Sequence, residues 1–199
     1  MKNYIAILLL TAGFNVFAGE EYNKSEGEFV LKYDVNLEKE SYPSSDEPAI
    51  VKPDLSQLDC AFIVEDIKDV RRNKQAIGTN FFLPLQAKKV DDWLNDLSSD
   101  LRREVISDTN TSLNKIIIKP EVSKIYSYAQ SMNLHGVIVF NVAFEKNGRE
   151  IEAKYYRGAA AKTNWINGLG EYGTTVNLAA ENIVLNILND LPSICKKMI

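Results

Sequence analysis

The chain has 199 residues, of which 45% are hydrophobic and 10% aromatic. It is therefore long enough for one domain with a packed core and too apolar for a disordered protein. Its formal net charge is −4, and residues 19–57 carry ten acidic side chains against four lysines, so the remainder is nearly neutral. A nucleic-acid-binding protein would need a concentrated basic face, and this balance excludes that class.

The first residues predict a secretory signal peptide. Lys2 supplies a positive charge, residues 4–17 form an apolar run, and Ala18 and Gly19 provide a cleavage site of small residues. The run is too short to cross the hydrocarbon core of a bilayer, which is about 30 Å thick. We expect cleavage between Ala18 and Gly19, export to the periplasm or beyond the cell, and no transmembrane segment in the mature chain.

Residues 19–57 predict an acidic extended arm, because prolines and serines interrupt a densely charged segment. Only residues 28–35 alternate well enough to suggest a strand, which could join the edge of a sheet. The arm is expected to act as a solvated spacer. A globular domain then spans residues 58–199.

The exported chain contains two cysteines, Cys60 and Cys195. In an oxidising compartment an isolated pair is most simply one disulfide, which would tie the start of the domain to its end. Metal binding is the weaker alternative, because His135 is the only histidine and the sequence has no Cys-x-x-Cys motif.

The domain is expected to begin with a short buried strand at residues 59–64. A charged, aperiodic stretch from Glu65 to Gly78 predicts a loop after it. From Val90 to Val105 the apolar residues recur at helical spacing, with acidic residues in the first turn and arginines near the end. This pattern predicts an amphipathic helix.

Three strands are predicted next, at residues 114–128, 136–145 and 149–158. The middle run is apolar at nearly every position, which favours a central strand. Asn147-Gly148 supplies the two residues with positive φ that a type I′ hairpin turn requires. Pro120 indicates an edge position or a bulge in the first of these strands.

A second helix is predicted over residues 174–191, with Thr174 or Thr175 as its cap and Pro192 as its end. The predicted fold is therefore α+β. It is a mostly antiparallel sheet of about four strands with two helices packed on one face, in the order β-α-β-β-β-α.

Over residues 58–192 the chain resembles the YajG-type family of envelope lipoproteins. The resemblance is carried by Asp66, Asp69 and Arg71 in the loop after the first strand, Val122-Ser123-Lys124-Ile125-Tyr126, Asn147-Gly148, Lys154-Tyr155-Tyr156-Arg157-Gly158 and the asparagine-rich last helix. It implies residence in the cell envelope without a defined reaction. YajG-type proteins carry a lipid-modified cysteine at the end of the signal, whereas residues 16–19 contain none, so we expect no lipid anchor.

Two polar segments are candidates for interaction with a partner. The first is the charged loop after the first strand, where a guanidinium group would suit a carboxylate or phosphate; the alternative is a solvated loop with local ion pairs. The second precedes the last helix, where a tryptophan with amide neighbours could anchor a protein or a glycan, or could fold over the sheet edge. The candidate residues are Asp66, Asp69, Arg71, Arg72 and Lys74 in the first segment and Asn164, Trp165 and Asn167 in the second.

The sequence offers little catalytic chemistry. Residues 168–173 spell G-x-G-x-x-G, but no parallel strand can follow the last helix, so we expect a flexible turn rather than a dinucleotide site. His135 is expected to be a turn residue between two strands, and neither a serine nor a cysteine has a partner base. We expect no catalytic residue, no cofactor and no metal.

These features predict a soluble, non-catalytic accessory or binding module of the bacterial periplasm. It would contact an envelope protein or another envelope component through the two polar segments or an exposed sheet edge. An alternative is an immunity or inhibitor protein that neutralises a toxin aimed at the envelope. An enzyme is the least favoured class, because it would need a cleft with convergent polar groups.

Overall fold

The computed structural model describes residues 27–37, 40–41, 48–80, 83–105, 114–164 and 168–197. The predicted signal peptide and its cleavage site at Ala18 and Gly19 lie outside these residues, as do Trp165 and Asn167. Neither helix in the described part of the chain combines the length and the apolar character needed to span a membrane.

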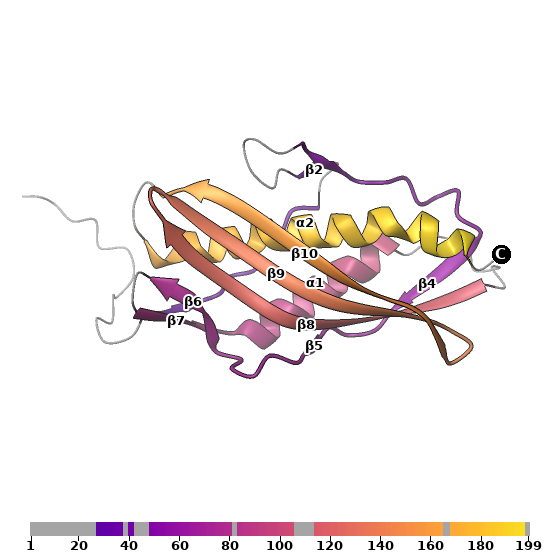
Figure 1. Cartoon of the computed structure of the whole chain (residues 1–199), viewed down its shortest axis with the longest axis horizontal. Helices are drawn as coiled ribbons and strands as arrows, with labels where there is room; N and C mark the ends of the chain where they lie inside the picture. Colours follow the sequence, from indigo (N-terminus) through magenta and orange to yellow (C-terminus); the bar gives the residue numbers. More distant parts are fainter. Residues whose placement is uncertain are drawn as a thin grey trace, which may run out of the picture.

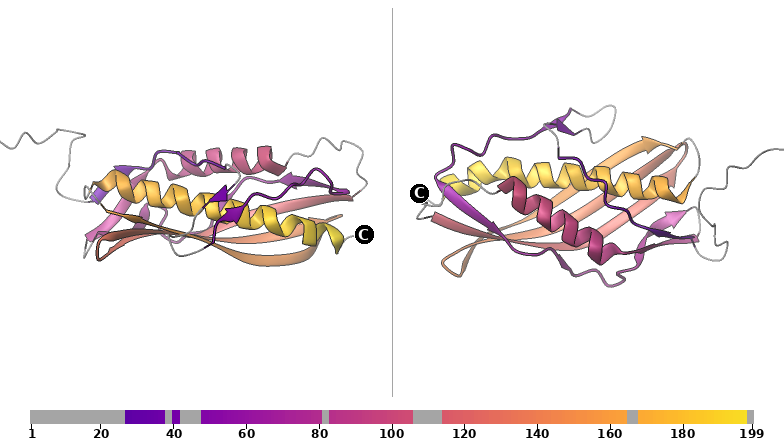
Figure 2. Two further views of the ribbon diagram at one scale, coloured as in Figure 1. Left: turned by 90° about the horizontal axis from the view of Figure 1, so that it is seen from above. Right: turned by 180° about the vertical axis from the view of Figure 1, so that it is seen from behind.

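Two helices lie on one face of an eight-stranded mixed sheet, so the fold has two layers (Figures 1 and 2). The helices are α1 (Val90–Val105) and α2 (Leu169–Lys196). The sheet contains β1 (Gly27–Val30), β4 (Cys60–Val64), β5 (Lys68–Asp69), β6 (Ala76–Asn80), β7 (Leu83–Lys88), β8 (Asn114–Gln130), β9 (Asn133–Lys146) and β10 (Arg149–Thr163). A separate two-stranded sheet pairs β2 (Glu40–Ser41) with β3 (Ile50–Val51).

The sheet is larger than predicted and is not mostly antiparallel. The predicted antiparallel meander is present as β8, β9 and β10, and both residues of the Asn147-Gly148 turn have positive φ. The other edge of β8 pairs in parallel with β4, β5 and β6 in succession, and β1 pairs in parallel with β7. β5 and β6 fall largely in the stretch predicted as a loop. Their short, polar sequences lack the apolar alternation that marks a strand.

Pro120 lies inside the sheet, whereas an edge position or a bulge was predicted; the irregularity of β8 falls between Val122 and Lys124. Glu65 donates its N–H to Ile118 O, and Val70 donates its N–H to Val122 O. Pro120 lies between these two acceptors, so its backbone nitrogen points to the same side of β8. At that point β4 has ended and β5 has not begun, so no neighbouring strand of the described chain is present to accept a hydrogen bond. The missing N–H of the proline therefore removes no bond from the ladder.

Helix α1 has the predicted bounds, and its predicted apolar stripe is buried. Helix α2 differs from the prediction at both ends. It begins at Leu169, with Gly168 as its N-cap, and continues through Pro192 to Lys196. Thr174 and Thr175 therefore lie inside the helix and do not cap it, and the Thr175 hydroxyl lies 2.9 Å from the Ser127 hydroxyl in the core. Burial of Ile194 and of the disulfide cysteine Cys195 favours the extra turn.

The described part of the acidic arm packs on the domain, whereas a solvated spacer was expected. Between Phe29 and Leu37, alternate residues turn inward, and Leu31 is only 2% exposed. Trp93 donates its indole N–H to Asn177, which donates in turn to the Lys32 carbonyl. This buried bridge joins α1, α2 and the arm, so α2 is covered on the side that faces away from the sheet as well.

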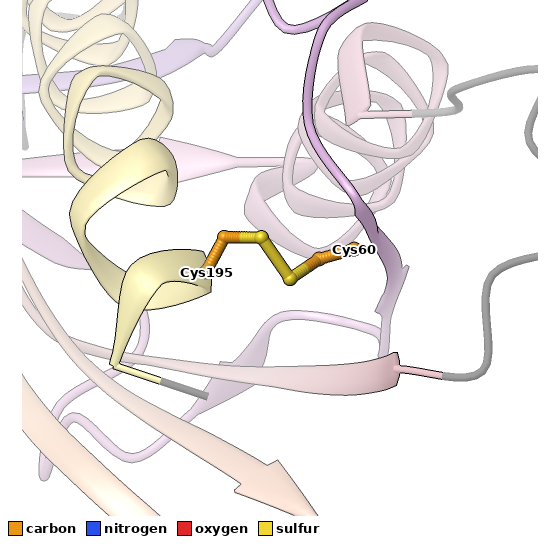
Figure 3. The surroundings of a disulfide bond; sticks show 2 residues. All are labelled: Cys60 and Cys195. Carbon is orange, nitrogen blue, oxygen red and sulfur yellow. A yellow bond between two sulfur atoms is a disulfide. The ribbon is translucent and has the colours of Figure 1, made fainter. Parts of the chain in front are cut away.

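The predicted disulfide between Cys60 and Cys195 is confirmed. It joins the first residue of β4 to the last turn of α2, and both cysteines are buried (Figure 3). The bridge spans 135 residues of sequence, so it links the beginning and the end of the domain.

Candidate interaction surface

The two faces of the β8–β10 meander have different surroundings. Along β9, buried and partly exposed residues alternate. The buried set, which includes Phe140 and Phe144, faces the helices. The other set faces away from both helices, where the described residues place no further layer (Figure 2). We call this second surface the outer face.

Aromatic side chains form one end of the outer face. Tyr128 stacks on His135 with a centroid separation of 4.9 Å, and Tyr126 lies 5.6 Å from Tyr128. The Lys124 ammonium lies 5.4 Å from the centre of the Tyr126 ring. His135 is thus a strand residue in an aromatic cluster and not the predicted turn residue.

The middle of the outer face carries two cations on one row. The strand register aligns Lys124 with Val139 and Val139 with Arg157, so the two cations flank an aliphatic side chain. Tyr155, two residues before Arg157 on the same face, is 80% exposed. Lys124, Tyr155 and Arg157 are not among the site residues predicted from the sequence. The alternation of charged and uncharged residues between Arg149 and Gly158 is the signal in the sequence that places Tyr155 and Arg157 on one face.

The charged side chains of β10 that point inward form an ion-pair network with the end of α2. Lys154 contacts Asp190 at 3.0 Å, and Lys197 contacts Glu152 at 2.6 Å. Tyr156 donates its hydroxyl to Asp190 at 2.8 Å. Burial and this hydrogen bond raise the pKa of Tyr156, so the phenol stays protonated at physiological pH. The network gives the inner side of an edge strand a polar partner.

The strand β10 ends the sheet, and part of its outer edge has no partner among the described residues. Asn164, just beyond the strand, donates its N–H to Met132 O on the β9 side. The backbone N–H and C=O groups of successive residues point to opposite sides of a strand. The groups of odd-numbered residues of β10 therefore point to the free edge. Asn182 confirms this direction by donating to Ala159 O at 2.6 Å. The hydrogen bonds found for the described chain leave the edge from Ala153 to Arg157 open.

The charged loop of the sequence analysis does not form one binding cluster. Asp69 and Arg71 form a two-bond ion pair with side chains only 5% exposed, and Arg71 also donates to the Lys74 carbonyl at 2.7 Å. Burial alone would raise the pKa of Asp69. The hydrogen bonds and charge of Arg71 outweigh that effect and hold the pKa below its usual range. This pair holds the loop in shape.

The remaining candidates of that loop point elsewhere. Asp66 pairs with Arg102 of α1, whereas Arg72 and Lys74 are exposed at the surface. In the second predicted segment, only Asn164 is described. The described residues contain no group of histidine, cysteine and carboxylate side chains that could hold a metal ion.

The glycine motif at residues 168–173 also differs from its predicted form. Only Gly168 precedes the helix, and the remainder forms the first turns of α2 rather than a flexible turn. A Cβ at Gly173 would lie 3.3 Å from the Phe29 ring, so this glycine allows the arm to approach the helix closely. The motif thus has a packing role in the structure.

No family model matches the sequence, and no curated protein matches it. Among solved structures, a Xanthomonas campestris protein of the DUF330 family matches with a TM-score of 0.56 at 9% sequence identity. The match covers 85% of this chain and 96% of that one. A candidate lipoprotein from Caulobacter crescentus CB15 has a TM-score of 0.40 at 9% identity, covering 69% of this chain and 91% of that one.

The Xanthomonas likeness shows a shared α+β fold and nothing further, because its sequence identity is so low. The Caulobacter likeness is too distant in structure to carry an argument. The resemblance to YajG-type lipoproteins therefore stays a prediction.

Proposed function

We propose that this protein is a soluble, non-catalytic binding module of the bacterial periplasm that contacts an envelope protein. The observation that carries the proposal is the edge of β10, part of which pairs with no other described strand, beside the outer face, which no described element covers. An open sheet edge offers a partner a row of backbone donors and acceptors, and exposed side chains beside it can provide specificity.

The periplasmic location has separate support. The Cys60–Cys195 disulfide fits an oxidising compartment, and the first eighteen residues predict export. The mass of the protein purified from its own cells tests this part. We expect a chain that begins at Gly19, carries no lipid and has two hydrogens fewer than the reduced form. An N-terminal lipid or an uncleaved signal would contradict the proposed processing.

Site-specific photocrosslinking in the native envelope tests the binding role. A photoreactive phenylalanine analogue at Tyr155 or at Ile63 would lie on exposed parts of the sheet, and the same analogue at Asn95 of α1 is the control. We expect a discrete adduct with one envelope protein from the sheet positions and none from Asn95. The absence of any adduct at the sheet positions would contradict a binding role for this surface.

The identity of the adduct separates the two predicted classes of binding module. A structural or transport component of the envelope supports the accessory role. A secreted toxin that loses its activity on binding would support the inhibitor alternative.

A further inference from the structure

The open part of the β10 edge has the size of a binding site for one short strand. The edge-facing residues Ala153, Tyr155 and Arg157 supply three N–H and three C=O groups. Beyond Arg157 along the strand, the Ala159 carbonyl already accepts a hydrogen bond from Asn182, and α2 approaches Gly158 closely. Five residues of strand span about 17 Å. A guest of five to seven residues would therefore fill the opening without displacing α2.

The side chains beside this opening indicate a negatively charged guest. Arg157 makes no ion pair or hydrogen bond in the described part of the chain, and Lys124 contacts only the Tyr126 ring. The neighbouring carboxylates are engaged, since Glu121 pairs with Lys68 and Glu145 pairs with Lys119. Arg157, the cation at the edge, therefore lacks a counter-charge among the described residues, and Lys124 on β8 adds positive charge to the same row two strands away. Glu150 at the hairpin end is the remaining exposed carboxylate of β10.

Charge also argues against a second copy of this chain as the guest. β10 contains four cationic residues, Arg149, Lys154, Arg157 and Lys162, and two acidic residues, Glu150 and Glu152. Pairing β10 with itself would bring two strands of net positive charge together, which is less favourable than pairing with an acidic strand. An acidic strand has the opposite balance.

We propose that the β10 edge between Ala153 and Arg157 binds an extended acidic segment of a partner protein as an added strand. The guest backbone bonds to the three edge residues, and a guest carboxylate on the outer face binds Arg157. Tyr155 lies beside Arg157 on the same face and offers a ring for an aliphatic guest residue. This inference rests on the proposed function and names the chemistry of its partner.

Peptide binding to the purified mature protein tests the proposal directly. The probe is a fluorescent peptide of about seven residues that alternates glutamate and valine, compared with one that alternates lysine and valine. We expect saturable binding of the glutamate peptide that weakens as salt is raised, with at least about tenfold weaker binding of the lysine peptide. Equal binding of the two peptides, or no saturable binding of the glutamate peptide, would overturn the proposal.

Two pairs of variants locate the binding site. Ala153→Pro removes an edge N–H without touching the bonds to β9, and Ala153→Val keeps that N–H. Arg157→Glu reverses a charge at the edge, and Arg72→Glu makes the same change on the exposed loop. We expect about tenfold weaker binding from Ala153→Pro and from Arg157→Glu, with little change from their controls. Arg157→Glu decides the outcome if the proline variant does not fold.

The remaining outcomes are also distinguishable. Equal loss from Arg157→Glu and Arg72→Glu would mean a general charge effect and would overturn the proposed site. Sedimentation that shows a dimer, dissociated by Ala153→Pro, would instead identify a second copy as the occupant. If the glutamate peptide fails to bind while photocrosslinking at Ile63 still yields one envelope protein, the result supports the proposed binding function and contradicts the proposed acidic guest strand.

Discussion

The two faces of one meander show how differently a single set of strands can be used. On the inner face, β9 and β10 meet α2 so closely that a Cβ at Gly136 would overlap the Thr175 carbonyl, and a Cβ at Gly158 would overlap the Ala179 carbonyl. Polar groups there have partners, as in the Ser127–Thr175 hydroxyl pair. On the outer face, Arg157 lacks such a partner among the described residues and Tyr155 extends into solvent. Stability and interaction are thus divided between the faces.

Neighbouring residues of β10 show this division most clearly. The charged residues Glu152 and Lys154 point inward, where Lys197 and Asp190 form ion pairs with them. The less polar residues Ala153 and Tyr155 point outward. An inward-pointing charge on an edge strand discourages nonspecific pairing with another sheet. The edge therefore remains open to a strand of suitable charge while resisting aggregation.

The largest expected effect on the folded layer comes from removal of the disulfide. Replacing Cys60 and Cys195 by alanine opens a loop of 135 residues in the unfolded chain. The chain-entropy relation gives a loss of about 4–5 kcal/mol in the free energy of unfolding. Urea denaturation measures the loss. Reductant should lower the stability of the wild-type protein and leave the double variant unchanged; an equal response of both would contradict a stabilising disulfide.

Replacing Gly136 by valine should cost about 3 kcal/mol in the free energy of unfolding. The new side chain would collide with the Thr175 carbonyl and push α2 away from the sheet. Ala143→Val, on the outer face of the same strand, adds two methyl groups at a partly exposed position that faces away from the helices and serves as the control. Urea denaturation of both variants compares the faces directly. Equal losses from the two substitutions would contradict the division between them.

The sequence predicts the parts of the fold that have a strong local pattern. The stripe from Val90 to Val105, the Asn147-Gly148 turn and the Cys60–Cys195 pair all appear in the structure as expected. β6 and β7 were missed because they join the sheet through β8 and β1, which pair with β6 and β7 respectively and lie far from them in the sequence. The continuation of α2 beyond Pro192 has the same origin, since burial of the last turn outweighs the local preference of proline.

Part of the candidate surface could also be anticipated. The strict alternation in residues 149–158 indicated which residues share a face, but not which face meets the helices. Apolar content would place Ile151, Ala153 and Tyr155 inward. The structure turns Ala153 and Tyr155 outward because Glu152 and Lys154 find ion-pair partners at the end of α2. Those partners lie more than thirty residues away, and no local pattern reveals them.

Substitution of Asp69 by asparagine should cost about 2 kcal/mol at neutral pH, because it removes a charged hydrogen-bond acceptor from the buried Arg71. The pKa of Asp69 is depressed in the folded protein, so its contribution is complete above the ordinary carboxyl pKa of 3.8 and is lost as pH falls below it. Denaturation of both proteins between neutral pH and about pH 3 checks the sign. A difference that grows in acid would contradict this role of Asp69.

The smallest expected effect is on the outer face. Replacing Tyr155 by serine together with Arg157 by glutamine should change the free energy of unfolding by less than about 0.5 kcal/mol, because neither side chain is buried among the described residues. Tyr156→Phe is the matched inner-face control. It removes a hydroxyl that bonds to Asp190, and it should cost about 1 kcal/mol. Thermal denaturation of the two variants compares adjacent residues on opposite faces of one strand. If the outer pair proves as costly as the inner hydroxyl, Tyr155 and Arg157 contribute to the fold, and their exposure no longer indicates a surface kept for a partner.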